Sequence, residues 1–443
     1  MSKIPKRAGL AASRHDAPIP TDFNSIPNLK QALSINTDTP SFIGSTMVTL
    51  MYCFIFLIQG YLLFDIIYVG VSAIAGRLSK GDDEPVNKPV NRIRRIAVLI
   101  PAYKEDKVIL DTIQANLKQM YPTQFYDLIV IADHFQRETL HQLSQHPIKV
   151  IDVAFEQSTV QRSLMYALNN LPRNDYDIVL ICDADNHMAT DFLERINAAF
   201  DKGWRAVQGH RVAKNTNTSV AVFDAINEEI NNNIFRSGQR ALGMSASLIG
   251  SGMAFETKAM HRALNLTCTV GGYDKELSMN LSVDRIRIAY LKNAFIYDEK
   301  VQDLDIFEQQ RTRWIAAQLF FVKAYFRLAL QELRKGNIAA VNIFLKALLL
   351  PRTLFLAVLV SEILLGLLIK SWIILLSASW MLGLLIIILL LSVPNYLWSK
   401  LSWRDFTTFS LLIFRMLRSA TKFKIAEKRF LHTPHGETAI NKQ

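Results

Sequence analysis

The sequence predicts a domain of class α/β, with a mostly parallel sheet, flanked by transmembrane and interfacial α-helices. Short apolar runs alternate with helix-like segments between residues 92 and 300. Two long stretches, near residue 50 and near residue 380, carry almost no charge. Hydrophobic residues make up 50% of the chain and charged residues only 20%. This composition excludes a disordered chain, a collagen-like chain and a small disulfide scaffold.

The N-terminal part predicts a tail, a membrane helix and a linker. Residues 1–38 are polar with scattered prolines, and we expect them to form a mobile tail. Residues 39–64 carry no charge. Because a membrane span needs roughly 20 apolar residues, this stretch predicts a first transmembrane helix over residues 39–76. Residues 77–91 include GDDEPVNKPVN, which is typical of a linker.

The middle of the chain predicts a sheet with helices between its strands. Apolar runs predict buried strands over residues 96–101, 128–133, 149–153 and 178–183. The intervening segments predict helices over residues 106–120, 159–170 and 190–201. Apolar runs of this length, separated by helices, favour parallel pairing because both faces of each strand are covered.

The C-terminal third predicts further membrane elements. Residues 316–346 mix large apolar side chains with basic ones, which is typical of interfacial helices, although a soluble core helix explains 316–335 equally well. Residues 347–396 predict a transmembrane hairpin, and residues 397–443 a basic interfacial helix and tail. Glu362 falls within the hairpin. It either has a functional role, forms a hydrogen bond to a neighbouring helix, or lies close enough to the membrane surface to reach water.

Charge predicts the orientation of these elements. The net charge is +11, and Lys and Arg gather just after the first membrane helix and again at residues 400–429. The positive-inside rule then places residues 77–340 in the cytoplasm, with three spans and the N-terminus outside, in the cell (inner) membrane. Basic clusters beside membrane segments indicate contact with anionic lipid, and we expect no nucleic-acid partner. The three cysteines have no metal-ligand or disulfide spacing.

Polar residues follow the predicted strands at the ends where α/β sheets bind ligands. Tyr103 and Glu105 follow the first strand, Asp133 ends the second, and Asp183 and Asp185 follow the fourth. An acidic rim of this kind suits a divalent cation, which in turn can hold a diphosphate. The sequence has no glycine-rich phosphate loop, no HExxH and no nucleophile elbow, which argues against P-loop ATPases, Rossmann dehydrogenases and nucleotidyltransferases.

The order of these motifs resembles that of a known family. The sequence contains PAYKE at 101–105, IAD at 131–133, CDAD at 182–185, GSGMAF at 250–255 and QQRTRW at 309–314. Together they resemble the membrane-integrated family-2 glycosyltransferases, the group of the cellulose, chitin, hyaluronan and poly-N-acetylglucosamine synthases. The resemblance implies a cytoplasmic nucleotide-sugar-binding domain of GT-A type over residues 92–315.

The resemblance also implies roles for individual residues. It implies donor-binding roles for Tyr103, Glu105, Asp133, Arg162, Asp183, Gln310 and Arg313. It implies acceptor-binding roles for Gly250, Ser251, Gly252 and Trp314. Asp185, with Asp183, is expected to hold Mg2+ or Mn2+ at the donor diphosphate. Arg162 stands where the family usually has a Lys, and the two cations are not interchangeable.

The general-base motif departs from the family pattern. The family usually has Thr-Glu-Asp followed by alternating leucines, whereas this sequence has Gly272 and Tyr273 before Asp274. The alternation of Leu277, Met279 and Leu281 fixes the register and makes Asp274 the expected catalytic base. Glu276 remains the alternative base.

The expected function is inverting transfer of sugar from a nucleotide-sugar, here a UDP-sugar, to a growing polysaccharide by repeated addition. Export or accessory subunits are plausible partners, because three spans are few for a complete channel. Two alternatives stay open: transfer of one sugar to a lipid-linked acceptor, and a non-catalytic membrane scaffold with a retired transferase domain. In the scaffold, Asp274 would only cap a helix, and QxxRW would be a docking face.

Overall fold

The computed structural model describes residues 39–83, 90–172, 174–267, 272–402 and 405–426. Contacts divide the chain into two units, Met1–Gly60 and Tyr61–Gln443. Helix α2 (Thr39–Leu78) passes through the boundary between these units. The tail expected over residues 1–38 lies outside the described residues.

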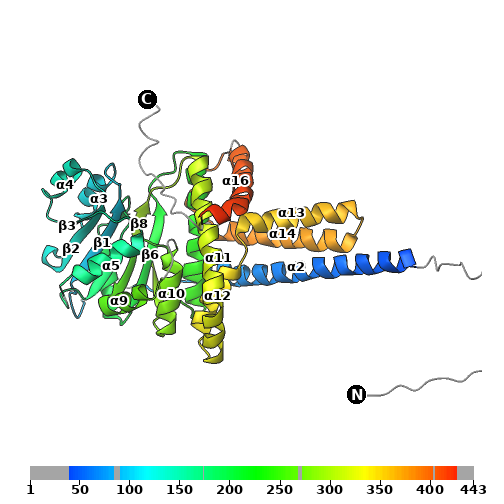
Figure 1. The fold of residues 1–443 in the computed structure, drawn as a ribbon, viewed down its shortest axis with the longest axis horizontal. Helices are drawn as coiled ribbons and strands as arrows, with labels where there is room; N and C mark the ends of the chain where they lie inside the picture. The colour runs from blue at the N-terminus through cyan, green and yellow to red at the C-terminus, as the bar shows by residue number, and fades with distance from the viewer. Residues whose placement is uncertain (1–38, 84–89, 173, 268–271, 403–404, 427–443) are drawn as a thin grey trace, which may run out of the picture. The chain divides into compact units, whose positions relative to one another are not determined.

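The second unit is built on one eight-stranded mixed sheet with the strand order β3-β2-β1-β4-β7-β6-β8-β5 (Figure 1). The strands are β1 (Ile96–Tyr103), β2 (Tyr126–Asp133), β3 (Lys149–Val153), β4 (Ile178–Ile181), β5 (His187–Met188), β6 (Ala206–Ala213), β7 (Met253–Glu256) and β8 (Ile288–Asp298). Strands β3, β2, β1 and β4 run parallel, as do β6 and β8. Strand β7 is antiparallel to both β4 and β6, and β5 is antiparallel to β8. The predicted mostly parallel α/β class is therefore confirmed.

The helices between and beside the strands include two with side-chain caps at their first turns. In chain order, the helical elements are α3 (Ile109–Asn116), the 3-10 turn η1 (Thr123–Phe125), α4 (Arg137–Leu143), α5 (Val160–Asn170), α6 (Phe192–Asp201), α7 (Ser219–Asn231), the π-helix η2 (Asn232–Gly238), α8 (Gln239–Ala241), α9 (Thr257–Asn265) and α10 (Tyr273–Val283). The side chains of Thr159 and Thr218 cap α5 and α7 by accepting hydrogen bonds from backbone N–H groups of the first turn.

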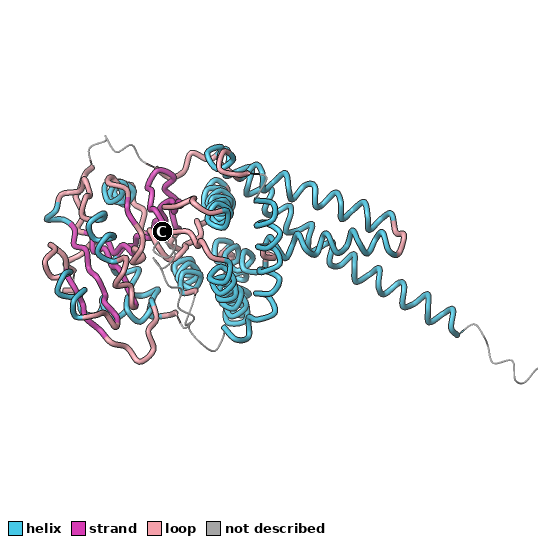
Figure 2. Tube along the Cα trace, turned by 90° about the horizontal axis from the view of Figure 1, so that it is seen from above, coloured by secondary structure: helices cyan, strands magenta, loops and turns pink. Residues whose placement is uncertain are grey.

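The sheet has a buried apolar core on each face, as alternation along its strands requires. Ile96, Val98 and Ile100 of β1 face the core that contains α3 and α6. Ala97 and Leu99 face the opposite core, which contains α5, α9 and α10. Figure 2 shows the strands as one layer with helices around it. Helices α5 and α10 on the same face bring their N-terminal ends to the edge of the sheet discussed below.

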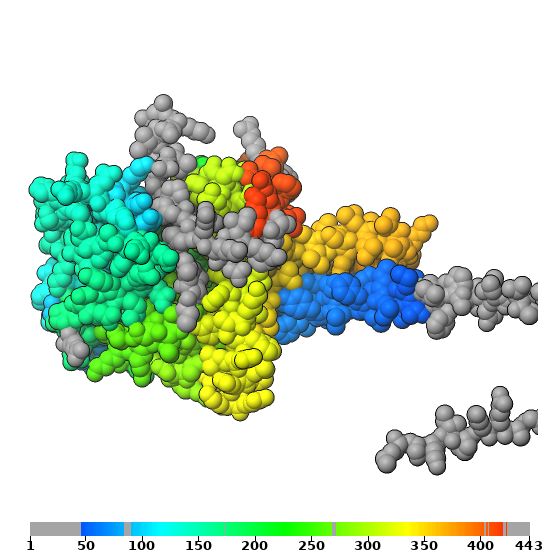
Figure 3. Space-filling view, in the orientation of Figure 1, coloured from blue at the N-terminus to red at the C-terminus, as the bar shows by residue number. Residues whose placement is uncertain are grey.

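The remaining helices follow the sheet in sequence. They are α11 (Leu304–Arg334), α12 (Ile338–Leu348), α13 (Arg352–Leu368), α14 (Trp372–Ser392), α15 (Asn395–Trp398) and α16 (Asp405–Ala426). Helix α16 packs against α11, which is visible in Figure 3. Three basic side chains of α16, Arg415, Arg418 and Lys422, contact the buried carboxylate of Glu308 on α11. Helix α11 runs without a break through residues 315 and 316, where the sequence suggested a domain boundary.

Two helices are long and apolar enough to cross a membrane, among the residues that the structure describes. They are Thr46–Leu78 of α2 and Trp372–Ser392, which is α14. Helices α12 and α13 pass the same test only as a pair, bent by 56° at the break between them. Glu362 is buried on α13. The structure thus contains two candidate spans, or three if the bent pair is one span.

The C-terminal end of α2 packs closely against the backbone of the π-helix η2. A Cβ atom at Gly76 would collide with the backbone oxygen of Asn233, and one at Gly238 would collide with the backbone oxygen of Ser72. Asn233 also donates hydrogen bonds from Nδ2 to Ala73 O (3.0 Å) and Ser392 Oγ (3.1 Å). The π-helix η2 therefore contacts both α2 and α14 through small and polar residues.

Candidate active site

The first part of the site lies at the carboxyl ends of β1 and β2. Tyr103 and Asp133 are direct neighbours in the parallel register. Asp133 is 1% exposed, and its Oδ1 accepts a hydrogen bond from Phe155 N (3.2 Å) and lies 2.6 Å from His134 Nδ1. Asp133 Oδ2 is buried and has no hydrogen-bond partner among the described residues. A buried carboxylate oxygen without such a partner is suited to accept a hydrogen bond from a ligand.

The second part of the site is the turn that follows β4. Strand β4 ends at Ile181, so Cys182 and Asp183 already belong to this turn instead of the predicted strand. Asp183 N donates a hydrogen bond to Ser251 Oγ (3.0 Å). The side-chain amide of Asn186 is assigned the orientation that satisfies its neighbours. Its oxygen accepts a hydrogen bond from Ser251 Oγ (2.7 Å), and its nitrogen donates to Asp185 Oδ1 (2.9 Å) and Asp298 Oδ1 (3.1 Å). The carboxylate of Asp185 is therefore held in place by a neighbouring amide.

The segment Gly250–Gly252 lies against this turn. Gly252 has φ of +64°, and its N–H donates to Ile181 O (2.8 Å). A Cβ atom there would press on the side chain of Ile296, so both the conformation and the space require glycine. Gly250 O accepts a hydrogen bond from the Tyr273 hydroxyl (2.9 Å). The structure thus brings Gly250, Ser251 and Gly252 together with Asp183.

The N-terminal turn of α10 carries the two candidate bases. Burial raises the pKa of Tyr273, and the carboxylates of Asp183 and Asp274 raise it further, which puts both acidic residues close to this tyrosine. Asp274 is half-buried, and its Oδ1 accepts from Lys275 N (2.9 Å). Glu276 is 0% exposed, and its Oε2 accepts from the Tyr325 hydroxyl (2.7 Å). The helix therefore directs Asp274 toward the site and Glu276 into the contact with α11.

Helix α11 supplies the QxxRW residues. Burial lowers the pKa of Arg313, and the carboxylate of Asp183 opposes that effect, so this guanidinium lies near Asp183. Trp314 and Gln310 are half-buried. A Cβ atom at Gly272 would press on Ala317 Cβ, which shows that α11 passes close to the start of α10. Asp183, Asp274 and Arg313 thus come from three elements to one edge of the sheet.

The contacts described for two predicted donor residues, Arg162 and Glu105, lie within their own segments of the chain. Arg162 is exposed on α5, and its Nη1 donates to Gln157 O (2.7 Å). This contact directs the guanidinium to its own loop, and the described contacts do not join it to Asp183 or Asp185. Glu105 begins the turn after β1, where its carbonyl accepts from Val108 N and Ile109 N.

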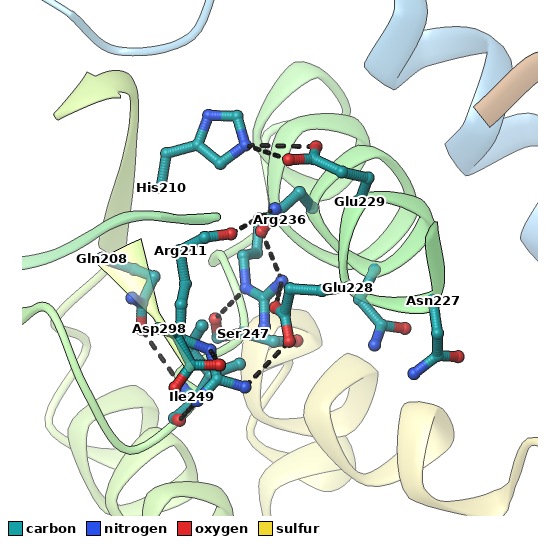
Figure 4. Close-up of polar contacts among 12 residues, drawn as sticks. Gln208, His210, Arg211, Asn227, Glu228, Glu229, Arg236, Ser247, Ile249 and Asp298 are labelled. Atoms are coloured by element: carbon teal, nitrogen blue, oxygen red, sulfur yellow. Dashed lines mark hydrogen bonds and ion pairs between the residues drawn. The ribbon is translucent and has the colours of Figure 1, made fainter. Parts of the chain in front are cut away.

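The structure also contains a buried ion network that the sequence did not predict (Figure 4). Glu228 on α7 pairs with Arg211 (2.8 Å) and Arg236 (2.9 Å), and it lies 3.8 Å from Lys300 Nζ. Burial acts to raise the pKa of Glu228, yet the surrounding cations hold it well below its ordinary value. Asp298 pairs with Lys300 (2.7 Å), and it reaches Asp185 through Asn186. The network is therefore joined to the turn after β4 through Asp298 and Asn186.

No sequence motif predicts this network, because its members come from elements far apart in the chain. Arg211 lies on β6, Glu228 on α7, Arg236 on η2 and Lys300 after β8. None of these residues stands at a motif spacing, and only the fold brings them together.

The carboxylates of the turn fit a divalent cation that is shared with a ligand. No group of three or more His, Cys, Asp or Glu side chains converges in the described part of the chain. Asp183 and Asp185 supply two carboxylates, and Asp185 is oriented by Asn186. Mg2+ and similar cations are commonly held by one or two carboxylates, with phosphate oxygens and water completing the shell. The donor set therefore suits a cation that binds together with a phosphate-containing ligand.

Known proteins share this fold and sequence pattern. Probable glycosyltransferase YdaM of Bacillus subtilis (strain 168) is 21% identical over 250 residues, which are 54% of this chain. The chain spans 60% of the length of that relative. The structure of the mannosyltransferase PcManGT from Pyrobaculum calidifontis matches with a TM-score of 0.50 at 14% identity, covering 84% of this chain and 97% of that one. This likeness shows that the two proteins share a fold, the GT-A type of α/β domain.

A family model gives the assignment. The model described as "Glycosyltransferase like family 2" matches residues 94–317, which run from the start of β1 to the QxxRW segment of α11. The matched region contains every part of the site described above. The chain therefore belongs to the glycosyltransferase-like family 2.

Proposed function

We propose that the protein is a membrane-bound inverting glycosyltransferase that moves sugar from a nucleotide-sugar, a UDP-sugar, to a growing polysaccharide by repeated addition. The observation that carries the proposal is that two neighbouring carboxylates, Asp183 and Asp185, lie near the half-buried side chains of Asp274 and Arg313 at one edge of the sheet. An inverting transfer needs a base, positive charge at the leaving group and a site for the acceptor.

The donor would lie along the carboxyl ends of β1, β2 and β4. Tyr103, Glu105 and Asp133 would hold the nucleoside, and the buried Oδ2 of Asp133 is suited to accept a hydrogen bond from it. Asp183 and Asp185 would hold Mg2+ or Mn2+. When bound, the cation supplies positive charge that stabilises the leaving diphosphate. PcManGT was solved in complex with GDP-Man and Mn2+, which supports this kind of donor and cation here.

Transfer would follow from the positions of Asp274 and Arg313. The acceptor hydroxyl oxygen forms a bond to the anomeric carbon of the sugar, and the bond from that carbon to the diphosphate oxygen breaks. The hydroxyl proton goes to Asp274, and the electron pair leaves with the nucleoside diphosphate. Arg313 would offset charge near the diphosphate and Gln310 would also contact the donor, while Trp314 and the Gly250–Gly252 segment would border the acceptor. Arg162 remains a proposed diphosphate contact.

A second candidate is transfer of one sugar to a lipid-linked acceptor. It is favoured by the small number of candidate spans, two helices or three with the bent pair, because a chain of so few spans does not by itself enclose a wide glycan path. A polysaccharide synthase with this architecture would need further copies or export subunits. The product distinguishes the two candidates.

The test uses purified membranes that contain the full chain and a panel of nucleotide-sugars. Mass spectrometry of the products should show a ladder of glycans built from one sugar. A single sugar on a lipid would instead favour the second candidate. Unchanged nucleotide-sugars with every donor in the panel, in the presence of Mn2+ and of Mg2+, would contradict both.

A further inference from the structure

Arg311 occupies an unspecified position of QxxRW, and its guanidinium lies between two aromatic rings. The guanidinium carbon is 4.0 Å from the centroid of the Trp314 ring and 4.6 Å from that of Phe307. Phe307, Arg311 and Trp314 follow one another at i, i+4 and i+7, so they share one face of α11. A planar guanidinium at these distances attracts the faces of both rings.

The position of this guanidinium is set from another helix. Arg311 forms an ion pair with Asp224 on α7, and the two residues are 6% and 7% exposed. Burial lowers the pKa of Arg311, and the carboxylates of Asp224 and Glu228 oppose that effect. Because a buried charge without its partner is strongly unfavourable, Asp224 restricts where the guanidinium can lie.

The same face of α7 also binds the start of the membrane hairpin. Arg352, the first residue of α13, donates from Nη2 to Asn227 Oδ1 (2.6 Å) and Asn231 Oδ1 (2.7 Å). Asp224, Asn227 and Asn231 are spaced i, i+3 and i+7 along α7, which puts them on one side of the helix. Helix α7 thus contacts both the side chain that stacks on Trp314 and the first turn of α13.

We propose that Arg311 is a positioning residue that fixes the Trp314 ring against α11 for the acceptor sugar, and that Asp224 fixes Arg311 in turn. The inference rests on the proposed function, in which Trp314 borders the acceptor. A sugar ring binds an aromatic face only when that face is correctly oriented. Arg311 itself touches neither donor nor acceptor, so it acts through Trp314.

The first test is Arg311→Lys in the full-length protein. Lysine keeps the charge but loses the flat guanidinium that stacks on the ring. We expect the acceptor KM to rise by about tenfold while the nucleotide-sugar Kd changes by less than about twofold. Arg334→Lys is the matched control, because Arg334 is exposed on the same helix, and both constants should stay unchanged.

A double-mutant cycle separates positioning from a general structural effect. In a Trp314→Leu background, Arg311→Lys should raise the acceptor KM by less than about twofold, because the ring it orients is gone. An equal loss in both backgrounds would overturn the inference. If Arg311→Lys fails to fold, Asp224→Glu replaces it, since it keeps the charge and moves the carboxylate by one methylene. It should raise the acceptor KM with Trp314 present and leave it unchanged in the Trp314→Leu background.

The outcomes also separate this inference from the proposed function. Normal sugar transfer by Trp314→Leu would show that Trp314 has no acceptor role, and it would therefore overturn the inference as well. Impaired transfer by Trp314→Leu with a normal acceptor KM for Arg311→Lys would overturn the inference alone and leave the proposed function standing.

Discussion

Asp274 and Glu276 illustrate how one helical turn gives two nearby carboxylates different surroundings. They are two residues apart, so their side chains point about 200° apart on α10. Glu276 is buried and bonded to Tyr325, whereas Asp274 is half-buried beside Tyr273, near Asp183. These surroundings support the proposal that Asp274, and not Glu276, takes the proton of the acceptor hydroxyl.

The change Asp274→Asn removes the proposed proton acceptor but keeps the shape of the side chain. We expect sugar transfer to fall by at least about 10²-fold, because general-base catalysis is lost. Donor affinity should stay within about twofold, since the base acts in the transition state. Turnover and nucleotide-sugar Kd of the purified variant measure the two effects.

The matched variant is Glu276→Gln, whose amide oxygen can still accept from Tyr325. It should lose far less activity than Asp274→Asn. If Glu276→Gln is inactive while Asp274→Asn turns over normally, the register of the base motif is shifted by two residues.

At the residue scale, sequence patterns predicted only those site residues that lie at strand ends or within sequence motifs. The alternation of Leu277, Met279 and Leu281 favoured Asp274 over Glu276 as base, and the observed burial of Glu276 is compatible with that choice. Asn186 and Asp298 could not be found in this way, because Asn186 donates to both Asp185 and Asp298 and so joins a turn to the end of β8. Arg311 was visible in the sequence, but its contact with Asp224 depends on how α7 packs on α11.

At the element scale, the first four strands were predictable and the later ones were not. Strands β1, β2 and β4 are largely buried apolar runs, since both of their faces are covered, whereas β3 at the edge of the sheet is only partly buried. Strand β6, AVQGHRVA, is polar in its second half, and β5 has only two residues. Strand β6 pairs with residues of β8 that are 82 to 85 positions away, and β5 with residues 108 to 110 positions away, which no local pattern encodes.

The junction between α2 and η2 gives a prediction for a single helix contact. Gly76→Ala adds a Cβ atom that would meet the backbone of Asn233, and backbone yields less than a side chain. We expect overpacking to cost about 1–3 kcal/mol, seen as a lower Tm of the detergent-purified protein. The control is Gly60→Ala on the same helix, where a Cβ atom meets nothing within 4 Å. Equal Tm values for the two variants would contradict this close contact.

At the scale of the whole molecule, the orientation in the membrane follows from charge, and labelling tests it. In a background without Cys53, a cysteine at Lys80 should resist a membrane-impermeant thiol reagent in intact cells, because the positive-inside rule places it in the cytoplasm. A cysteine at Lys370, in the short connection between α13 and α14, should react. Reaction at residue 80 together with protection at residue 370 would show that the orientation is opposite to the predicted one. It would also contradict the use of a cytoplasmic donor.

The central claim is that the turn after β4 holds the cation and diphosphate of a nucleotide-sugar during transfer. The measurement is sugar transfer by the purified protein with an accepted donor, after chelation of divalent cations and after Mn2+ is added back. Chelation should abolish transfer and Mn2+ should restore it, whereas Asp185→Asn should stay at least about 10²-fold below the wild type with Mn2+ present. Full transfer by the chelated wild type, together with normal turnover by Asp185→Asn, would contradict the account.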